Sequence, residues 1–171
     1  MSRPAPTDCP PAFQAYVDRV PDGDVLQHLA RQAEASAALL ARVPAAREGF
    51  AYAAGKWSIR RVWQHVVDGE RLFAYRALCI ARGETRDLPP FDEDAYAAQD
   101  GSCGRRLGDV LEEYAAVRRA TLLLFAGFDG AAWQRVGTAN GKRTAVRSLP
   151  WIVAGHELHH LAVLRERYGV A

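Results

Sequence analysis

Four segments of this chain repeat their apolar residues with the period of an α-helix, and stretches rich in glycine, proline and aspartate separate them. Each segment is long enough for a bundle helix, and no convincing run of strands accompanies them. We therefore predict an all-α fold, a four-helix bundle. Some of the loops exceed a dozen residues, so at least one crossover connection or functional loop is expected.

The limits of the first two helices follow from capping residues. The first helix is expected from about Asp24, which suits the N-cap, to Arg42, and Pro44 stops it. The second begins after Ser58, whose hydroxyl can accept a hydrogen bond from the first turn, and ends near Gly83.

The other two helices lie in the second half of the chain. The third is expected over residues 106–128, and the fourth from 146–149 to 168–169. Pro150 fits the first turn of the fourth helix, where no intrahelical N–H bond is lost. Between these helices, Asn140 and Gly141 suit a two-residue type I′ turn, so the sequence allows a short hairpin there.

Length and composition describe an ordinary soluble protein. The 171 residues fit one domain, 1–171, with an irregular N-terminal segment over 1–23, and 49% are hydrophobic. The 22 basic and 20 acidic residues form no block, so we expect no nucleic acid partner. No apolar run reaches the ~20 residues of a membrane span, and the N-terminus lacks the apolar part of a signal peptide, so we expect no membrane partner and a cytoplasmic protein.

The three cysteines indicate neither a disulfide framework nor a zinc ribbon. Cys9, Cys79 and Cys103 are far apart and never have a C-x-x-C spacing. Cys103 is expected in an exposed loop, where we interpret it as an ordinary loop residue.

Three of the five histidines lie within five positions of the last predicted helix. His156 and His160 are four residues apart and therefore share one face, on the same stripe as Ile152 and Leu164. This stripe should face the bundle interior, where neutral imidazoles need partners. A divalent ion usually takes at least three protein ligands, and His65 on the second helix is the natural third. The sequence therefore predicts a metal site at His65, His156 and His160.

Alternatives to this ligand set remain open. His159 can replace His160 as a ligand, orient another ligand or face a substrate. His28, on the first helix, is interpreted as a surface or packing residue. Without a metal, the same histidines would be hydrogen-bonded core or interface residues.

The letters HELHH also satisfy the H-E-x-x-H pattern, in which two histidines bind zinc and a glutamate, here Glu157, is the general base of a metalloprotease. The pattern is short and occurs by chance. Only eleven residues follow His160, with Glu166 as the sole carboxylate among them, so a downstream third ligand is poorly supplied. We therefore regard a protease as the less favoured hypothesis.

Three stretches together resemble the DinB/YfiT-like superfamily of metal-binding four-helix bundles. They are KWSIRRVWQHVVDGERLFAYRALCIARGE, LPPFDEDAYA and GTANGKRTAVRSLPWIVAGHELHHLAVLRERYG, and the resemblance covers Gly55 to Tyr168. It implies a bundle with a crossover connection, in which one histidine of the second helix and two of the last hold Ni²⁺ or Zn²⁺. The matching residues here are His65, His156 and His160.

The resemblance also implies an activity class. Some members are thiol transferases or isomerases that use a low-molecular-weight thiol such as bacillithiol, mycothiol or glutathione, and others are described as metal-dependent hydrolases. A small-molecule substrate and a homodimer are expected on the same ground. A different class of function stays open, in which the ion is structural and the protein is a binding or stress-response dimer without catalytic turnover.

Supporting roles are assigned only as weak candidates. Glu70 and Glu157 can orient ligands or move protons, as His159 can, although a solvent-facing helix carboxylate is the commoner case. The acidic stretch 90–96 can cover the mouth of the site, or be a solvated loop. Arg143 and Arg147 can meet the carboxylates of a small thiol.

Overall fold

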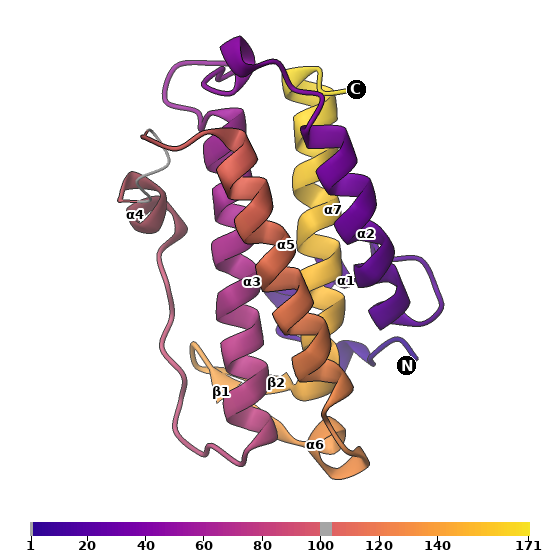
Figure 1. The fold of residues 1–171 in the computed structure, drawn as a ribbon. Helices are drawn as coiled ribbons and strands as arrows, with labels where there is room; N and C mark the ends of the chain where they lie inside the picture. The colour runs from indigo at the N-terminus through magenta and orange to yellow at the C-terminus, as the bar shows by residue number, and fades with distance from the viewer. Residues whose placement is uncertain (1, 100–103) are drawn as a thin grey trace.

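Four long helices form the body of the protein. The computed structural model describes residues 2–99 and 104–171. In Figure 1, α2 and α7 run upward while α3 and α5 run downward. Helices α2 and α3 each pack against both α5 and α7. The predicted all-α four-helix bundle is confirmed, and its helices are α2 (Val25–Leu40), α3 (Ile59–Ala81), α5 (Leu107–Ala126) and α7 (Leu149–Tyr168).

The helix ends lie close to the predicted limits because the expected caps are made. The Asp24 side chain accepts a hydrogen bond from the backbone N–H of Leu26, and the Ser58 side chain accepts one from that of Arg61. At the C-terminal end of α7, Gly169 has a φ of 64°, the left-handed conformation that ends this helix. Within the described residues, no helix is long and apolar enough to cross a membrane.

The connection from α3 to α5 is the predicted crossover. Because these two helices run in the same direction, the chain must return along the length of the bundle, as Figure 1 shows on its left side. The returning segment carries the short helix α4 (Glu93–Ala98), which Asp92 caps by accepting bonds from two backbone N–H groups. Cys103 lies outside the described residues, so the prediction that it is an exposed loop residue stays a prediction.

A short hairpin precedes the last helix. Its strands β1 (Val136–Ala139) and β2 (Lys142–Ala145) follow the one-turn-and-a-half helix α6 (Gly130–Gln134) and pair antiparallel. Asn140 and Gly141 have φ values of 52° and 65°, as a type I′ turn requires. Leu88 of the crossover donates its N–H to Thr138 O at 3.0 Å, so the hairpin also anchors the returning segment.

The N-terminal segment is more ordered than expected. It contains short 3₁₀ turns at Pro6–Asp8 and Pro11–Phe13, and the one-turn helix α1 (Gln14–Val17), which packs on α7. The close approach depends on Gly155, because a Cβ there would lie 1.9 Å from the carbonyl oxygen of Tyr16. The predicted irregular segment thus contains short helical turns, and it forms part of the wall around the histidines.

A buried polar network connects all four long helices. Arg118 of α5 donates to both carboxylate oxygens of Glu70 on α3, at 2.9 and 2.8 Å, and to Glu157 on α7 at 2.5 Å. Its remaining nitrogen donates to the backbone oxygen of Leu29 on α2 at 2.8 Å. The guanidinium and both carboxylates are almost completely buried. Such a network fixes the helices relative to one another because each partner is buried and satisfied.

Candidate metal centre

Helices α3 and α7 bring three histidines together. His65 comes from α3, and His156 and His160 come from successive turns of α7. The Nε2 atom of His156 lies 3.0 Å from His65 Nε2 and 3.1 Å from His160 Nε2. One nitrogen of each ring falls within 4.8 Å of those of the other two. The three histidines that the sequence predicted as metal ligands therefore lie close together.

The donor set and its spacing suit a divalent transition-metal ion. Zinc binds imidazole nitrogen at about 2.0–2.1 Å, so two nitrogens on one ion lie about 2.9–3.4 Å apart for angles of about 90–109°. Two of the three separations, those from His156 to His65 and to His160, are 3.0 and 3.1 Å and fall within this range. Imidazole suits zinc and nickel, as it does copper and iron. The residues present thus fit the ion that the resemblance implies.

Burial keeps the three imidazoles in the form that binds metals. It places the pKa of His156 well below the usual value, helped by the neighbouring His160 and His65. Burial likewise lowers the pKa of His160 to about 3 and that of His65 below 6.5, although the carboxylates of Glu93 and Asp94 oppose the shift at His65. At neutral pH each ring is uncharged and has a free lone pair for a ligand bond.

These pKa shifts predict that the metal-free protein loses stability in mild acid. Unfolded histidines take up a proton below pH 6.5, whereas folded His160 stays neutral to about pH 3. The unfolded chain then binds more protons, so the free energy of unfolding falls as the pH is lowered through this window. Urea titrations at pH 7.5 and 5.0 should show the loss, and His160→Gln should make it smaller. An equal pH dependence in that variant would contradict the assignment.

Aromatic rings and a glycine hold the histidines in place. The rings of Trp57 and His65 are 4.9 Å apart, and those of Tyr16 and His156 are 5.3 Å apart. Gly69 of α3 faces His156, and a Cβ added to it would lie 2.9 Å from Cε1 of that imidazole. The absence of a side chain at Gly69 therefore lets the His156 ring occupy its position between α3 and α7.

Replacing Gly69 by alanine should weaken metal binding. The added methyl group must push the ring of the ligand His156 away from its present position. Disturbing the surroundings that orient a ligand typically costs about 10–100-fold in metal affinity. Gly108→Ala is the matched control, because a Cβ on that exposed glycine of α5 meets nothing within 4 Å. Competition with a coloured chelator measures both affinities. Equal affinities in the two variants would show that the Gly69 contact is unimportant.

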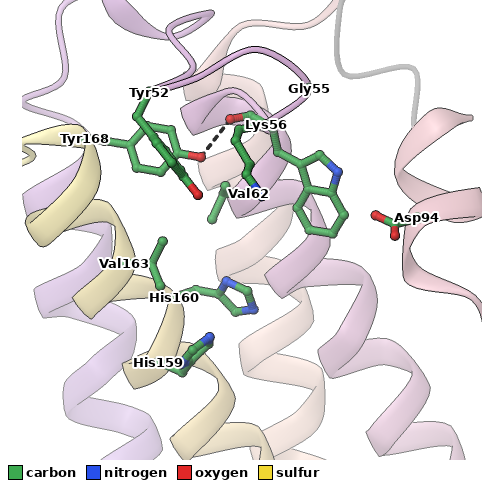
Figure 2. Close-up of a pocket in the computed structure, with 10 residues that line it drawn as sticks. Tyr52, Gly55, Lys56, Val62, Asp94, His159, His160, Val163 and Tyr168 are labelled. Atoms are coloured by element: carbon green, nitrogen blue, oxygen red, sulfur yellow. Dashed lines mark hydrogen bonds between the residues drawn. The ribbon is translucent and has the colours of Figure 1, made fainter.

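Two cavities reach the histidines from different sides. The larger, of about 270 Å³, has His160 and His159 in its wall, as Figure 2 shows, and extends toward Tyr52 and Lys56. Asp94 of α4 stands on its other side, so the predicted acidic stretch does flank the site. The rest of the lining consists of Gly55, Trp57, Val62, Val163 and Tyr168.

The smaller cavity, of about 160 Å³, touches the other two histidines. His65 and His156 line it, together with the buried Arg76 of α3. Sequence reasoning missed Arg76, although its position three residues after Phe73 placed a charged residue on the apolar face of the helix. The remaining lining residues are Phe13, Tyr16, Phe73, Phe91, Glu93 and Asn140.

The other two histidines lie outside the three-nitrogen cluster. His159 is half-buried, packs against Tyr16 and His160, and faces the larger cavity. Burial lowers its pKa, and the nearby Arg19 adds to the shift. His28 lies at the start of α2, with Nε2 3.3 Å from the backbone oxygen of Asp22, remote from the cluster.

Glu70 and Glu157 face the interior rather than solvent, so the solvent-facing alternative is wrong for both. Their carboxylates bind Arg118, and Glu157 also accepts hydrogen bonds from Ser36 and from Tyr114, the latter at 3.0 Å. Neither glutamate lines the cavities that reach the histidines. Through Arg118 they hold together α3 and α7, the two helices that carry the histidines.

Arg143 and Arg147 are committed to the N-terminal segment. Arg147 Nη2 lies 2.6 Å from Asp8 Oδ2, and Arg143 Nη1 lies 3.7 Å from Asp8 Oδ1. Neither arginine lines the two cavities at the histidines. Their suggested contact with a thiol's carboxylates is therefore replaced by a role in holding the first twenty residues against the bundle.

Comparison with known proteins identifies the superfamily of this chain. The profile of the DinB superfamily matches residues 28–164, so the chain belongs to this superfamily. A comparison with curated proteins found no match. YfiT from Bacillus subtilis, described as a probable metal-dependent hydrolase with an unusual four-helix bundle topology, is a similar solved structure. It aligns with a TM-score of 0.70 and 16% identity over 98% of this chain and 94% of its own.

A mycothiol-dependent maleylpyruvate isomerase has a similar structure as well. The TM-score is 0.66 at 14% identity, and the alignment covers 80% of this chain but only 58% of the isomerase. At such identities the likeness concerns the fold. The YfiT-like bundle predicted from the sequence is confirmed, while the reactions of these relatives remain properties of those proteins.

Proposed function

We propose that this protein is a metal-dependent enzyme whose His65, His156 and His160 hold one divalent ion, Ni²⁺ or Zn²⁺. The observation that carries the proposal is the convergence of three neutral imidazole nitrogens beside two cavities. A purely structural ion is normally enclosed by four protein ligands, whereas a catalytic ion keeps a position for substrate. Among the described residues, the cluster contains only these three His, Cys, Asp or Glu ligands.

The chemistry follows from this arrangement. When bound, a divalent ion acts as a Lewis acid that makes a coordinated thiol or water acidic enough to serve as a nucleophile near neutral pH. His159, on the wall of the larger cavity, is neutral at pH 7 and can accept the proton that is released. Trp57 and Val62 add apolar surface to the same wall. We favour transfer of a low-molecular-weight thiol to an electrophilic small molecule, with hydrolysis as the second reaction type.

The relatives support this class without fixing the reaction. One is described as a probable metal-dependent hydrolase and the other as a mycothiol-dependent isomerase, which correspond to the water and thiol alternatives. A homodimer located in the cytoplasm, with no nucleic acid or membrane partner, completes the proposal.

Two other functions are less well supported. In an H-E-x-x-H protease the glutamate must act beside the ion, but Glu157 is fully buried and bound to Arg118, Tyr114 and Ser36. A non-catalytic dimer with a structural ion conflicts with the cavities at the histidines. Without any ion, hydrogen bonds among the three rings would account for the same short distances.

Metal loading and activity test the proposal together. Protein purified without an affinity tag should contain, or take up, about one Ni²⁺ or Zn²⁺ per chain by elemental analysis. The loaded protein should then conjugate bacillithiol, mycothiol or glutathione to an electrophile such as 1-chloro-2,4-dinitrobenzene, or hydrolyse p-nitrophenyl acetate. His65→Ala should lose both properties, and His28→Ala should keep them. Failure to take up either metal would refute the proposal, and metal uptake without any turnover would favour the structural ion.

A further inference from the structure

We propose that the smaller cavity binds a carboxylate group through Arg76, and that the ligand it takes is an elongated organic monocarboxylate whose other end reaches the histidines. This deepens the proposed function, on which it rests for the reaction but not for the binding. Arg76 is buried, lacks a carboxylate partner among the residues that the structure describes, and lies on the same helix as His65.

Arg76 is a buried cation with little to balance it. The residue is 5% exposed. Within residues 2–99 and 104–171, its one hydrogen bond runs from Nη2 to the backbone oxygen of Pro89, at 3.0 Å, and it makes no ion pair. The ring of Phe73 lies 6.0 Å from the guanidinium carbon, near the limit for a cation–π contact. Buried charges are normally paired, and Arg76 lines the smaller cavity, so its remaining N–H groups are available to a ligand there.

The contrast with Arg118 strengthens the inference. Both arginines are buried in the same bundle, and Arg118 is held by two carboxylates of this chain. Asp87, whose charge acts on Arg76, is already engaged with the backbone N–H of Gly141. Arg76 therefore resembles one half of a bidentate arginine–carboxylate pair whose other half comes from outside the chain.

The position of Arg76 sets the form of the ligand. It follows His65 by eleven residues, which is three helical turns, so both side chains leave α3 on the same face. Side chains of a helix lean toward its N-terminus, which directs Arg76 toward the histidines. Phe13, Phe73 and Phe91 line the space between, so an apolar body suits the middle of the ligand. Glu93 on the same lining disfavours a second negative charge.

The test compares an acid with its neutral isostere in metal-free protein, where a carboxylate cannot bind to an ion. Calorimetry or ligand-observed NMR should show that 3-phenylpropionate binds at least about tenfold more tightly than 3-phenylpropanamide, as a charge-assisted pair implies. Arg76→Gln should abolish this preference. Lys56→Gln, which removes a cation from the larger cavity, should leave it unchanged.

The outcomes separate this inference from the proposed function. Equal binding of acid and amide by the wild type, or a preference that survives Arg76→Gln, would overturn it. Arg76→Lys should show an intermediate preference for the acid, because lysine keeps the positive charge but cannot form the bidentate pair of a guanidinium with a carboxylate. The wild-type comparison needs no variant, so misfolding of Arg76→Gln would leave the test decisive. A preference for the acid in a protein that binds no metal would sustain the inference while the proposed function fails.

A second arm identifies which reactant carries the carboxylate. Protein loaded with Co²⁺ should bind 6-mercaptohexanoate, which is long enough to reach Arg76, more tightly than 6-mercaptohexanol if the carboxylate belongs to the thiol, and Arg76→Gln should remove the difference. Equal thiol affinities, with binding of 3-phenylpropionate retained, would assign the carboxylate to the electrophile. Both results agree with the carboxylate site itself.

Discussion

Arg118→Ala should destabilise the metal-free protein by roughly 3–5 kcal/mol, the usual cost of removing one member of a buried ion pair. The substitution leaves the carboxylates of Glu70 and Glu157 buried without their cation, and it removes a side chain that contacts the other three helices of the bundle. Urea denaturation followed by circular dichroism measures the effect. Because typical small proteins are stable by only about 5–15 kcal/mol, the variant should be close to unfolding.

The neighbouring arginine provides the control for this prediction. Arg119 follows Arg118 on α5 but is exposed, so Arg119→Ala should change the free energy of unfolding by less than about 0.5 kcal/mol. A loss below about 1 kcal/mol for Arg118→Ala would mean that the network does not hold the bundle together.

His156→Gln should lower metal affinity by roughly 100-fold or more, since even the loss of a group that orients a ligand costs about 10–100-fold. His156 is the central member of the cluster, because its Nε2 is the atom near both other rings. Glutamine is used because it leaves a smaller cavity than alanine at this buried position. The affinity is measured by competition with a coloured chelator.

His28→Gln is the control for this second prediction. It replaces a histidine of α2 that lies outside the cluster, so it should leave metal affinity unchanged. If His156→Gln bound metal as tightly as His28→Gln, the ion would have to lie elsewhere in the protein.

The sequence was sufficient to predict features that depend on local patterns. Asp24 and Ser58 cap their helices as their side chains suggested, and Asn140 with Gly141 makes the expected hairpin turn. The meeting of the three histidines followed from helical periodicity, since the apolar stripe of each helix must face the bundle axis. The role of a residue is therefore predictable where it depends only on its own helix or turn, or on which face of the helix is apolar.

Features that depend on which helices are neighbours were not predictable in the same way. Glu157 was expected to be solvent-facing or to serve the site, but it lies on α7 toward α5, where Arg118 and Tyr114 bind it. The docking of the first twenty residues depends on Gly155, and no periodic signal marks such a contact. Arg76 had a local signal, an arginine on an apolar face, but its use becomes evident only with the cavity that it lines.

X-ray absorption spectroscopy of the Zn²⁺-loaded protein, without and then with a small thiol, tests the central claim most directly. The account predicts three imidazole nitrogens at about 2.0–2.1 Å and, on adding the thiol, a new Zn–S distance near 2.3 Å. That result would show a three-histidine ion with a position open to substrate. Fewer than three imidazoles, or a spectrum of four protein ligands that the thiol does not change, would contradict it.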